Sequence, residues 1–252
     1  DVRKLLIEFI TLSFFFIGMN AARADDTLRV GTTPAGAPFT YIDTATGETK
    51  GFMVDLIRAI ADDNHFKVSL VPMQFSTLVS ALAASKIDII SASMSPTEDR
   101  KKVVSFSDEV YSYGEGLIVP ASDTKVYTNV KDLKGYRVGT VVGTDYTDTM
   151  RATGLFKEVV TYDSTADIMR DIEAGRLNAG FGDYPVLADR FQHGRYPRLR
   201  LVDTYKPFAV GLGISIAVRK DEGTLLEKVD ASIRRFKKDG TLQKLLAKWN
   251  LK

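Results

Sequence analysis

The segment at residues 88–100, DIISASMSPTEDR, combines hydroxyl groups with an arginine in a pattern that suits anion binding. Apolar residues around Ile89 indicate a buried strand that leads into Ser93. Ser95 begins the sequence SPTE, which is typical of a helix N-terminus with Ser95 as the N-cap, and Arg100 follows. Backbone N–H groups at a helix start, hydroxyls and a guanidinium can together hold a carboxylate. The segment therefore predicts a carboxylate site; the alternative is that its charges belong to a solvated first turn.

Two later loops could face this segment with complementary groups. Residues 142–145 (VVGTD) follow a strand-like run and place Thr144 in a turn of small residues. Asp183 follows another strand-like run, at residues 179–181, and could receive an ammonium group. Its alternative role is the N-cap of a helix that begins near Tyr184. A cation for a carboxylate in one loop and an anion for an ammonium in another are what an α-amino acid requires.

Composition excludes several other chemistries. The chain has 252 residues and a formal net charge of +2, so no excess of positive charge indicates nucleic-acid binding. It has no cysteine, which excludes disulfides, thiol nucleophiles and thiolate metal sites. With only two histidines, His65 and His193, metal catalysis and a Ser-His-Asp triad have few candidate groups. We expect no metal and no cofactor.

The first 24 residues differ in composition from the rest. Two basic residues precede an apolar stretch at residues 5–18, and Ala-Arg-Ala at residues 22–24 matches a cleavage signal. We therefore expect a signal peptide at residues 1–24. The alternative, a membrane anchor, requires about 20 apolar residues, and Glu8 interrupts a run that is already shorter. Because no cysteine could carry a lipid, we expect the mature protein to be free in an exported compartment.

Strand and helix patterns alternate along the mature chain. Residues 28–32, 67–71 and 87–91 are typical of strands, and residues 52–61 and 76–84 of helices. This βαβ pattern predicts a mostly parallel sheet covered by helices.

Two short sequence echoes indicate that the pattern is used twice. YRVGT at residues 136–140 echoes LRVGT at 28–32, and IEAGRLN at 172–178 echoes LAASKID at 82–88, in the same order. We therefore expect two similarly built α/β lobes. In such a protein the ligand lies where the carboxyl ends of the strands converge, between the lobes.

The ordered set of motifs resembles a known family. The motifs are GFMVDL at 51–56, PMQFS at 72–76, SPTEDR at 95–100, FSD at 106–108, LKGYRVG at 133–139 and DGT at 239–241. Together they resemble the bacterial extracellular solute-binding proteins of family 3, the periplasmic amino-acid receptors of ABC transporters. Each motif alone is weak, but their order over residues 26–250 is specific.

The resemblance implies a type II periplasmic binding protein-like fold, two lobes with mostly parallel sheets flanked by helices and joined by a two-strand hinge. The first lobe would comprise residues 25–113 and 211–252, and the second residues 114–210, with crossings near 113–116 and 209–213. A monomer in the periplasm would bind a small amino acid or an analogue and deliver it to the membrane permease of an ABC transporter. It would be a binding protein and not an enzyme.

The resemblance also implies roles for individual residues. Arg100 matches the arginine that grips the α-carboxylate of the ligand, assisted by Ser93 and Ser95. Thr144 matches a second-lobe contributor to the same carboxylate, and Asp183 matches the acid that receives the α-ammonium.

Phe75 matches an aromatic residue that lies against the ligand side chain; its alternative is a core position. Thr33 stands where many relatives have an aspartate, which argues against a cationic ligand side chain, because a buried cation needs a paired acid. Gly36 stands where many relatives have an aromatic residue above the ligand, which leaves room for a bulkier or non-standard ligand. Met53 replaces a common acidic residue, and we expect it at the surface.

Two alternatives belong to other classes. Some relatives of this fold are periplasmic cyclohexadienyl dehydratases, which add a general acid and a cationic group to the pocket. In the corresponding loops this chain has Asp148 and Val186, so that equipment is missing. A ligand-sensing module would need a separate receptor.

Overall fold

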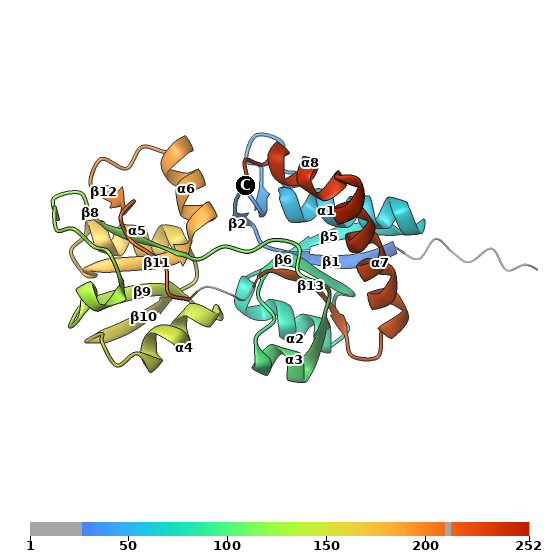
Figure 1. Cartoon of the computed structure of the whole chain (residues 1–252), viewed down its shortest axis with the longest axis horizontal. Helices are drawn as coiled ribbons and strands as arrows, with labels where there is room; N and C mark the ends of the chain where they lie inside the picture. Colours follow the sequence, from blue (N-terminus) through green and yellow to red (C-terminus); the bar gives the residue numbers. More distant parts are fainter. Residues whose placement is uncertain (1–26, 210–212, 252) are drawn as a thin grey trace, which may run out of the picture.

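The computed structural model describes residues 27–209 and 213–251. Two lobes lie side by side, each built on its own β-sheet with helices packed around it (Figure 1). The predicted two-lobed α/β architecture is therefore confirmed. The predicted signal peptide at residues 1–24 lies outside the described residues. Within them, no helix combines the length and the apolar character that a membrane span needs.

The sheet of the first lobe has the strand order β5-β1-β6-β13-β7. β1 pairs in parallel with β5 and β6, whereas β13 runs antiparallel to β6 and β7. The strands are β1 (Thr27–Thr32), β5 (Lys67–Pro72), β6 (Ile89–Met94), β7 (Val104–Phe106) and β13 (Ser215–Arg219).

The sheet of the second lobe repeats this arrangement with the order β10-β9-β11-β8-β12. β9 pairs in parallel with β10 and β11, and β8 runs antiparallel to β11 and β12. The strands are β8 (Glu115–Pro120), β9 (Arg137–Val141), β10 (Glu158–Tyr162), β11 (Ala179–Asp183) and β12 (Leu199–Leu201). The two echoed segments, at 28–32 and 136–140, lie in β1 and β9, which hold equivalent second places, so the predicted repeat corresponds to a structural repeat.

Helices cover the faces of both sheets. The first lobe carries α1 (Phe52–Asn64), α2 (Leu78–Ala83), α3 (Glu98–Val103), α7 (Gly223–Asp239) and α8 (Thr241–Lys248). The second carries α4 (Asp145–Ala152), α5 (Thr165–Glu173) and α6 (Tyr184–His193). Smaller elements are β2 (Ala35–Gly36), β3 (Thr40–Ile42), β4 (Thr49–Lys50) and the 3₁₀ turns η1 (Phe75–Thr77) and η2 (Val130–Leu133).

α1 packs its apolar face into the core of the first lobe. Leu56 and Ile60 recur at helical spacing and are fully buried. Met53 is also 0% exposed, so the expectation that it lies at the surface was wrong; its position one residue into the helix turns it toward the core. Gly51 precedes the helix with a φ of 133°, and a Cβ there would overlap the backbone of Phe39, so only glycine fits this junction.

The start of α3 also differs from the prediction. The helix begins at Glu98, and its N-cap is Thr97, whose hydroxyl accepts a hydrogen bond from the backbone N–H of Arg100 at 3.3 Å. Ser95 therefore does not cap the helix. Its carbonyl oxygen accepts a hydrogen bond from the Arg100 guanidinium at 2.7 Å, and the following proline disfavours a helical backbone at Ser95.

Two segments connect the lobes, one between β7 and β8 and one between β12 and β13. On the side of the first lobe, the Ile214 N–H donates to the Tyr111 carbonyl at 2.7 Å. On the side of the second, the Glu115 carboxylate accepts hydrogen bonds from the Tyr205 hydroxyl at 2.8 Å and from the Phe208 N–H at 2.9 Å. These contacts tie the two crossings together. The predicted lobe boundaries fall in these segments, in part among residues outside the described ranges, and stay a prediction.

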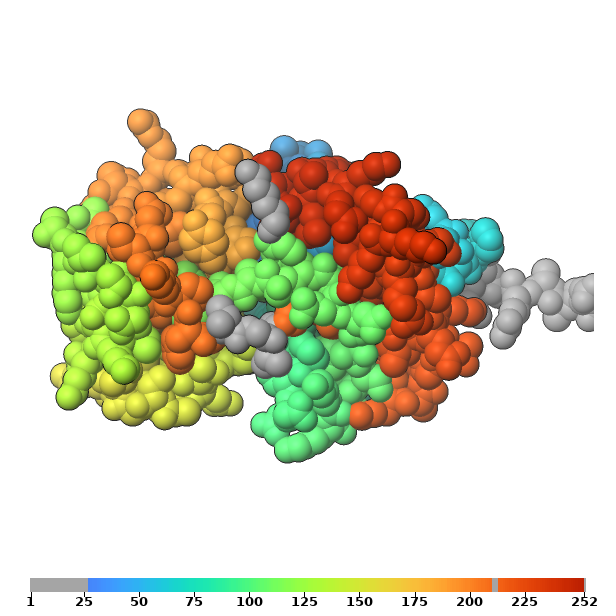
Figure 2. All heavy atoms as spheres, viewed as in Figure 1, coloured from blue at the N-terminus to red at the C-terminus, as the bar shows by residue number. Residues whose placement is uncertain are grey.

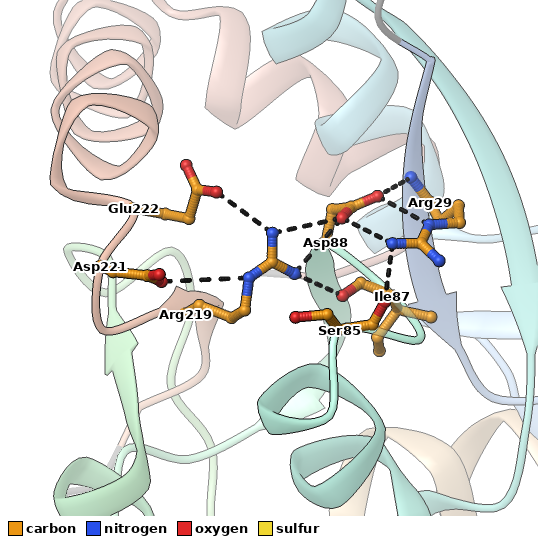
Figure 3. Close-up of polar contacts among 7 residues, drawn as sticks. All are labelled: Arg29, Ser85, Ile87, Asp88, Arg219, Asp221 and Glu222. Carbon is orange, nitrogen blue, oxygen red and sulfur yellow. Dashed lines mark hydrogen bonds and ion pairs between the residues drawn. The ribbon is translucent and has the colours of Figure 1, made fainter.

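A cluster of charged side chains lies at the end of the first sheet where β1 and β6 begin (Figure 3). Asp88, just before β6, accepts hydrogen bonds from the Arg29 guanidinium at 2.9 and 3.0 Å and from Arg219 at 3.3 Å. These contacts join the amino-terminal ends of β1 and β6 to the end of β13. Burial acts to raise the pKa of Asp88, but hydrogen bonds from both arginines outweigh burial and hold that pKa below its usual value.

Replacing Asp88 with alanine should lower the free energy of unfolding at pH 7 by about 1 to 3 kcal/mol, because two guanidinium groups lose their acceptor. Urea denaturation measures this change. A carboxyl group whose folded-state pKa is depressed stabilises the fold above its unfolded-state pKa, and this contribution is lost as pH falls through the folded-state value. The difference should therefore persist at pH 5 and shrink only below about pH 4.

Asp221→Ala is the matched control. Asp221 is 85% exposed and lies 4.0 Å from Arg219, so its loss should cost less than about 0.5 kcal/mol. Equal stabilities of the two variants would contradict a structural role for Asp88.

Candidate functional site

A cavity of about 160 Å³ lies between the two lobes. In Figure 2, a notch separates the second lobe, in yellow, from α2 and α3 of the first lobe, in green. Six of the seven residues that the sequence predicts for the site line this cavity: Thr33, Phe75, Ser93, Ser95, Thr144 and Asp183. They come from both lobes because the carboxyl ends of the parallel strands in the two sheets meet there. β1 leads into Thr33, β6 into Ser95 and β9 into Thr144.

Arg100, the seventh predicted residue, stands beside the cavity and is not one of its lining residues. Its guanidinium donates hydrogen bonds to the carbonyl oxygens of Ser95 and Gly143, each at 2.7 Å, and lies 5.4 Å from the ring centroid of Phe75. Burial lowers the pKa of the Arg100 guanidinium, and the nearby carboxylates of Asp145 and Asp183 oppose that effect. Because a guanidinium has five N–H donors, donors remain beyond these two bonds.

Hydrogen bonds from two arginines join the lobes across the cavity. Arg100 of the first lobe donates to the Gly143 carbonyl of the second, and Arg190 of α6 in the second lobe donates to the Ala35 carbonyl of the first at 3.3 Å. Gly143 has a φ of 80°, and a Cβ there would lie 2.8 Å from Cα of Ser76 in the first lobe. The lobes are thus in direct contact, and we call this arrangement closed.

Asp183, at the end of β11, occupies a half-buried and polar position. Its carboxylate accepts a hydrogen bond from the Ser93 hydroxyl of the first lobe at 3.5 Å, and the nearby hydroxyls of Tyr113 and Tyr146 act to lower its pKa. Burial raises the pKa of Asp183 to about 6, the hydroxyl donors counteract this shift, and the charge of Asp145 adds to it. The structure therefore keeps a carboxylate in an environment that disfavours its charge, as a site for a cation would.

The remaining predicted residues have local hydrogen bonds. The Thr33 hydroxyl lies 2.5 Å from that of Thr40, and the Thr144 hydroxyl donates to the Val141 carbonyl at 2.7 Å. Gly36 lines the cavity and presents no side chain to it. Among the described residues, no group of acidic or histidine side chains could hold a metal ion.

Four residues near the cavity were not among the predicted ones. Asp145, Tyr146 and Asp163 line the cavity, and Tyr113 reaches Asp183 from the first crossing segment. Asp145 follows Thr144 directly, and Asp163 follows the end of β10, so the rule that loops after parallel strands face the ligand could have identified both. No local sequence pattern marks either tyrosine, because each depends on how separate elements pack.

Comparison with known families places the chain clearly. Residues 28–252 match the bacterial extracellular solute-binding proteins, family 3. One relative is the ABC transporter arginine-binding protein 1 of Escherichia coli (strain K12), which is 29% identical over 248 residues that cover 98% of this chain and 99% of that protein.

Solved structures give the same result. An ancestral arginine-binding protein bound to arginine is 32% identical, with a TM-score of 0.79 over 88% of this chain and 97% of that chain. An ancestral amino acid-binding protein described as a precursor of cyclohexadienyl dehydratase is 30% identical, with a TM-score of 0.77 over 88% of this chain and 95% of that chain.

Replacing Asp183 with asparagine should stabilise the ligand-free protein at pH 7 by about 1 to 3 kcal/mol. The folded-state pKa of about 6 exceeds the ordinary 3.8, so the folded protein binds the extra proton between these values and loses stability as pH rises through that window. Asparagine removes this penalty and still accepts a hydrogen bond. The gain, measured by urea denaturation, should be smaller at pH 5 than at pH 7; a loss of stability at pH 7 would contradict the argument.

Proposed function

The chain belongs to the bacterial extracellular solute-binding proteins, family 3, and we propose that it captures an α-amino acid between its lobes for the membrane permease of an ABC transporter. The observation that carries the proposal is one interlobe cavity with a guanidinium beside it and a half-buried carboxylate in its wall. The two groups, Arg100 and Asp183, have the charges that an α-carboxylate and an α-ammonium require.

In this proposal the first lobe binds the α-carboxylate. Arg100 supplies charged N–H donors, and Ser93 and Ser95 supply hydroxyls from the end of β6. The Thr144 hydroxyl of the second lobe would join them by turning from the Val141 carbonyl, to which it now donates, toward the ligand. Asp183 receives the α-ammonium, which would replace the hydroxyl donors that now surround its carboxylate. Phe75 supplies an apolar surface to the ligand side chain.

Closure couples binding to transport. A ligand that contacts both lobes stabilises the closed arrangement by its differential affinity for that state. The hydrogen bonds of Arg100 to Gly143 and of Arg190 to Ala35 stabilise the same closed arrangement. In this proposal Arg190 stabilises closure and does not contact the ligand. The permease would then recognise the closed form, and binding rather than catalysis is the proposed activity.

Three features favour binding over an enzymatic role. Val186, at the position where a dehydratase would carry a catalytic group, is an apolar lining residue, and Asp148 is exposed and does not line the cavity. The solved precursor of cyclohexadienyl dehydratase is itself described as an amino acid-binding protein. A ligand-sensing role would use the same site and differ only in the partner that reads closure.

The relatives support a proposal about where the protein acts, and their ligands differ from the one that Thr33 predicts. Because family members are periplasmic receptors of ABC transporters, we propose that this protein acts as an exported monomer in the periplasm, with residues 1–24 as its signal. The absence of an aspartate at Thr33 predicts a non-cationic ligand side chain, whereas two of the three relatives named above are described as arginine-binding proteins. The side chain of the ligand therefore has to be argued from the cavity wall.

Arg100→Ala should reduce amino-acid affinity by about thirtyfold to several thousandfold, because the α-carboxylate loses its charged partner. Isothermal titration of the protein, stripped of bound ligand by unfolding and refolding, against the common amino acids measures this. Lys101→Ala, on the same helix and with an exposed ion pair to Glu98, is the control and should bind normally. Normal binding by the Arg100 variant would refute the site.

Arg190→Ala should weaken binding of every ligand by a similar factor, about fivefold, because it removes one interlobe hydrogen bond and no ligand contact. The loss should appear as faster dissociation in stopped-flow measurements, since the closed state becomes less stable. Arg195→Ala removes an exposed charge from the same lobe and should have no effect. A change in selectivity instead of a uniform loss would mean that Arg190 contacts the ligand.

A further inference from the structure

Charge is distributed unequally over the wall of the interlobe cavity. The first lobe contributes only uncharged lining residues, among them Thr33, Gln74, Phe75 and Ser93. The second lobe contributes three carboxylates, from Asp145, Asp163 and Asp183, and among the described residues no basic side chain lines the wall.

Only one of these carboxylates has a role in binding the α-amino acid group itself. Asp183 is surrounded by hydroxyl donors and stands opposite Ser93 of the first lobe. Asp145 and Asp163 have no side-chain hydrogen bond or ion pair to another described residue. Two positive charges lie beside the cavity, Arg100 and Arg190, and Arg190 donates a hydrogen bond to the carbonyl of the lining residue Ala35. A zwitterionic ligand with a neutral side chain would thus leave an excess of negative charge in the site.

Helix stabilisation does not fully explain the two acids. Asp145 is the first residue of α4, and Asp163 precedes Ser164, the N-cap of α5, so both lie where acids favour a helix dipole. However, α4 already has Asp148 in its first turn and α5 has Asp167. These two acids do not line the cavity. Stabilisation of the two helix dipoles therefore does not by itself explain why Asp145 and Asp163 line the cavity.

Asp145 and Asp163 also stand at different places in the wall. Asp145 is close enough to Arg100 and Asp183 to act on the pKa of both, so it lies near the α-amino acid group. Asp163 follows β10, which flanks β9 at the edge of the sheet, and it is exposed to solvent. A side chain that extends from the α-carbon along the second lobe would pass from the first acid toward the second.

We propose that Asp145 and Asp163 bind a cationic side chain of the ligand, so that the second lobe alone distinguishes charged from neutral amino acids. This proposal rests on the proposed function and names its substrate class.

Because both acids lie in the second lobe, side-chain charge is recognised late, when the lobes close on the ligand. A ligand that first contacts the first lobe meets Arg100, hydroxyls and Phe75, which do not discriminate by side-chain charge. The acids reach the side chain when the lobes close. Selectivity for charge is then expressed in the stability of the closed complex, hence in the dissociation rate.

Arginine and citrulline form the ligand pair for the test, because their side chains have nearly the same shape and differ in charge. The protein, stripped of bound ligand, should bind arginine at least about tenfold more tightly than citrulline. Asp145→Asn should reduce this preference strongly, and Asp163→Asn less, because solvent screens an exposed carboxylate. The double variant should bind both ligands with similar affinity, because the loss for arginine should be much larger than any change for citrulline.

Asp148→Asn is the matched control, since it removes one acid from the first turn of α4 outside the cavity. It should retain the full preference for arginine. Retained citrulline binding in each variant shows that the site is folded. In stopped-flow measurements, Asp145→Asn should speed arginine dissociation and change its association rate by less than about threefold.

The outcomes separate the two proposals. Tighter binding of citrulline or another neutral amino acid by the unmodified protein, or an unchanged preference in the double variant, overturns the assignment of Asp145 and Asp163 and leaves the proposed function standing. If Asp145→Asn slows the association of arginine and leaves its dissociation rate unchanged, the inference that charge is distinguished on closure is overturned. Failure of every amino acid to bind the unmodified protein would instead refute the proposed function itself.

Discussion

The contact on which this structure depends is the hydrogen bond of Arg100 to the carbonyl of Gly143 in the other lobe. It requires a half-buried guanidinium in α3, a left-handed backbone at Gly143 and a close approach of that residue to Ser76. The guanidinium of Arg100 also lies over the ring of Phe75 and donates to the Ser95 carbonyl. One side chain thus links the two lobes, and in the proposed function the same group binds the ligand.

The site is organised by charges that the fold does not neutralise internally. Burial raises the pKa of Asp183, which has hydroxyl groups but, among the described residues, no cation at hydrogen-bond distance. In the cluster at the other end of the strands of the first lobe, Asp88 has two guanidinium partners, and its pKa is lowered. The two aspartates thus differ in whether a positive charge of the protein itself accompanies them, and this difference supports the proposed role of Asp183.

The two segments that connect the lobes are held together on both sides. Glu115, 1% exposed, holds the second crossing segment through Tyr205 and Phe208, and a β-bridge between Tyr111 and Ile214 joins the crossings on the other side. The connection between the lobes is therefore part of the hydrogen-bonded structure of each lobe.

The sequence by itself determined the repeated α/β lobes and part of the cavity wall, because hydrophobic periodicity and small-residue turns after strands are local features. Thr33, Phe75, Ser93, Ser95, Thr144 and Asp183 were identified in this way or by resemblance. Only the tertiary structure decided the burial of Met53, the cap at Thr97 and the convergence of Asp145, Asp163, Tyr113 and Tyr146. Each of these depends on which separate elements pack together, and side chains far apart in the sequence share a cavity only once two lobes have folded and met.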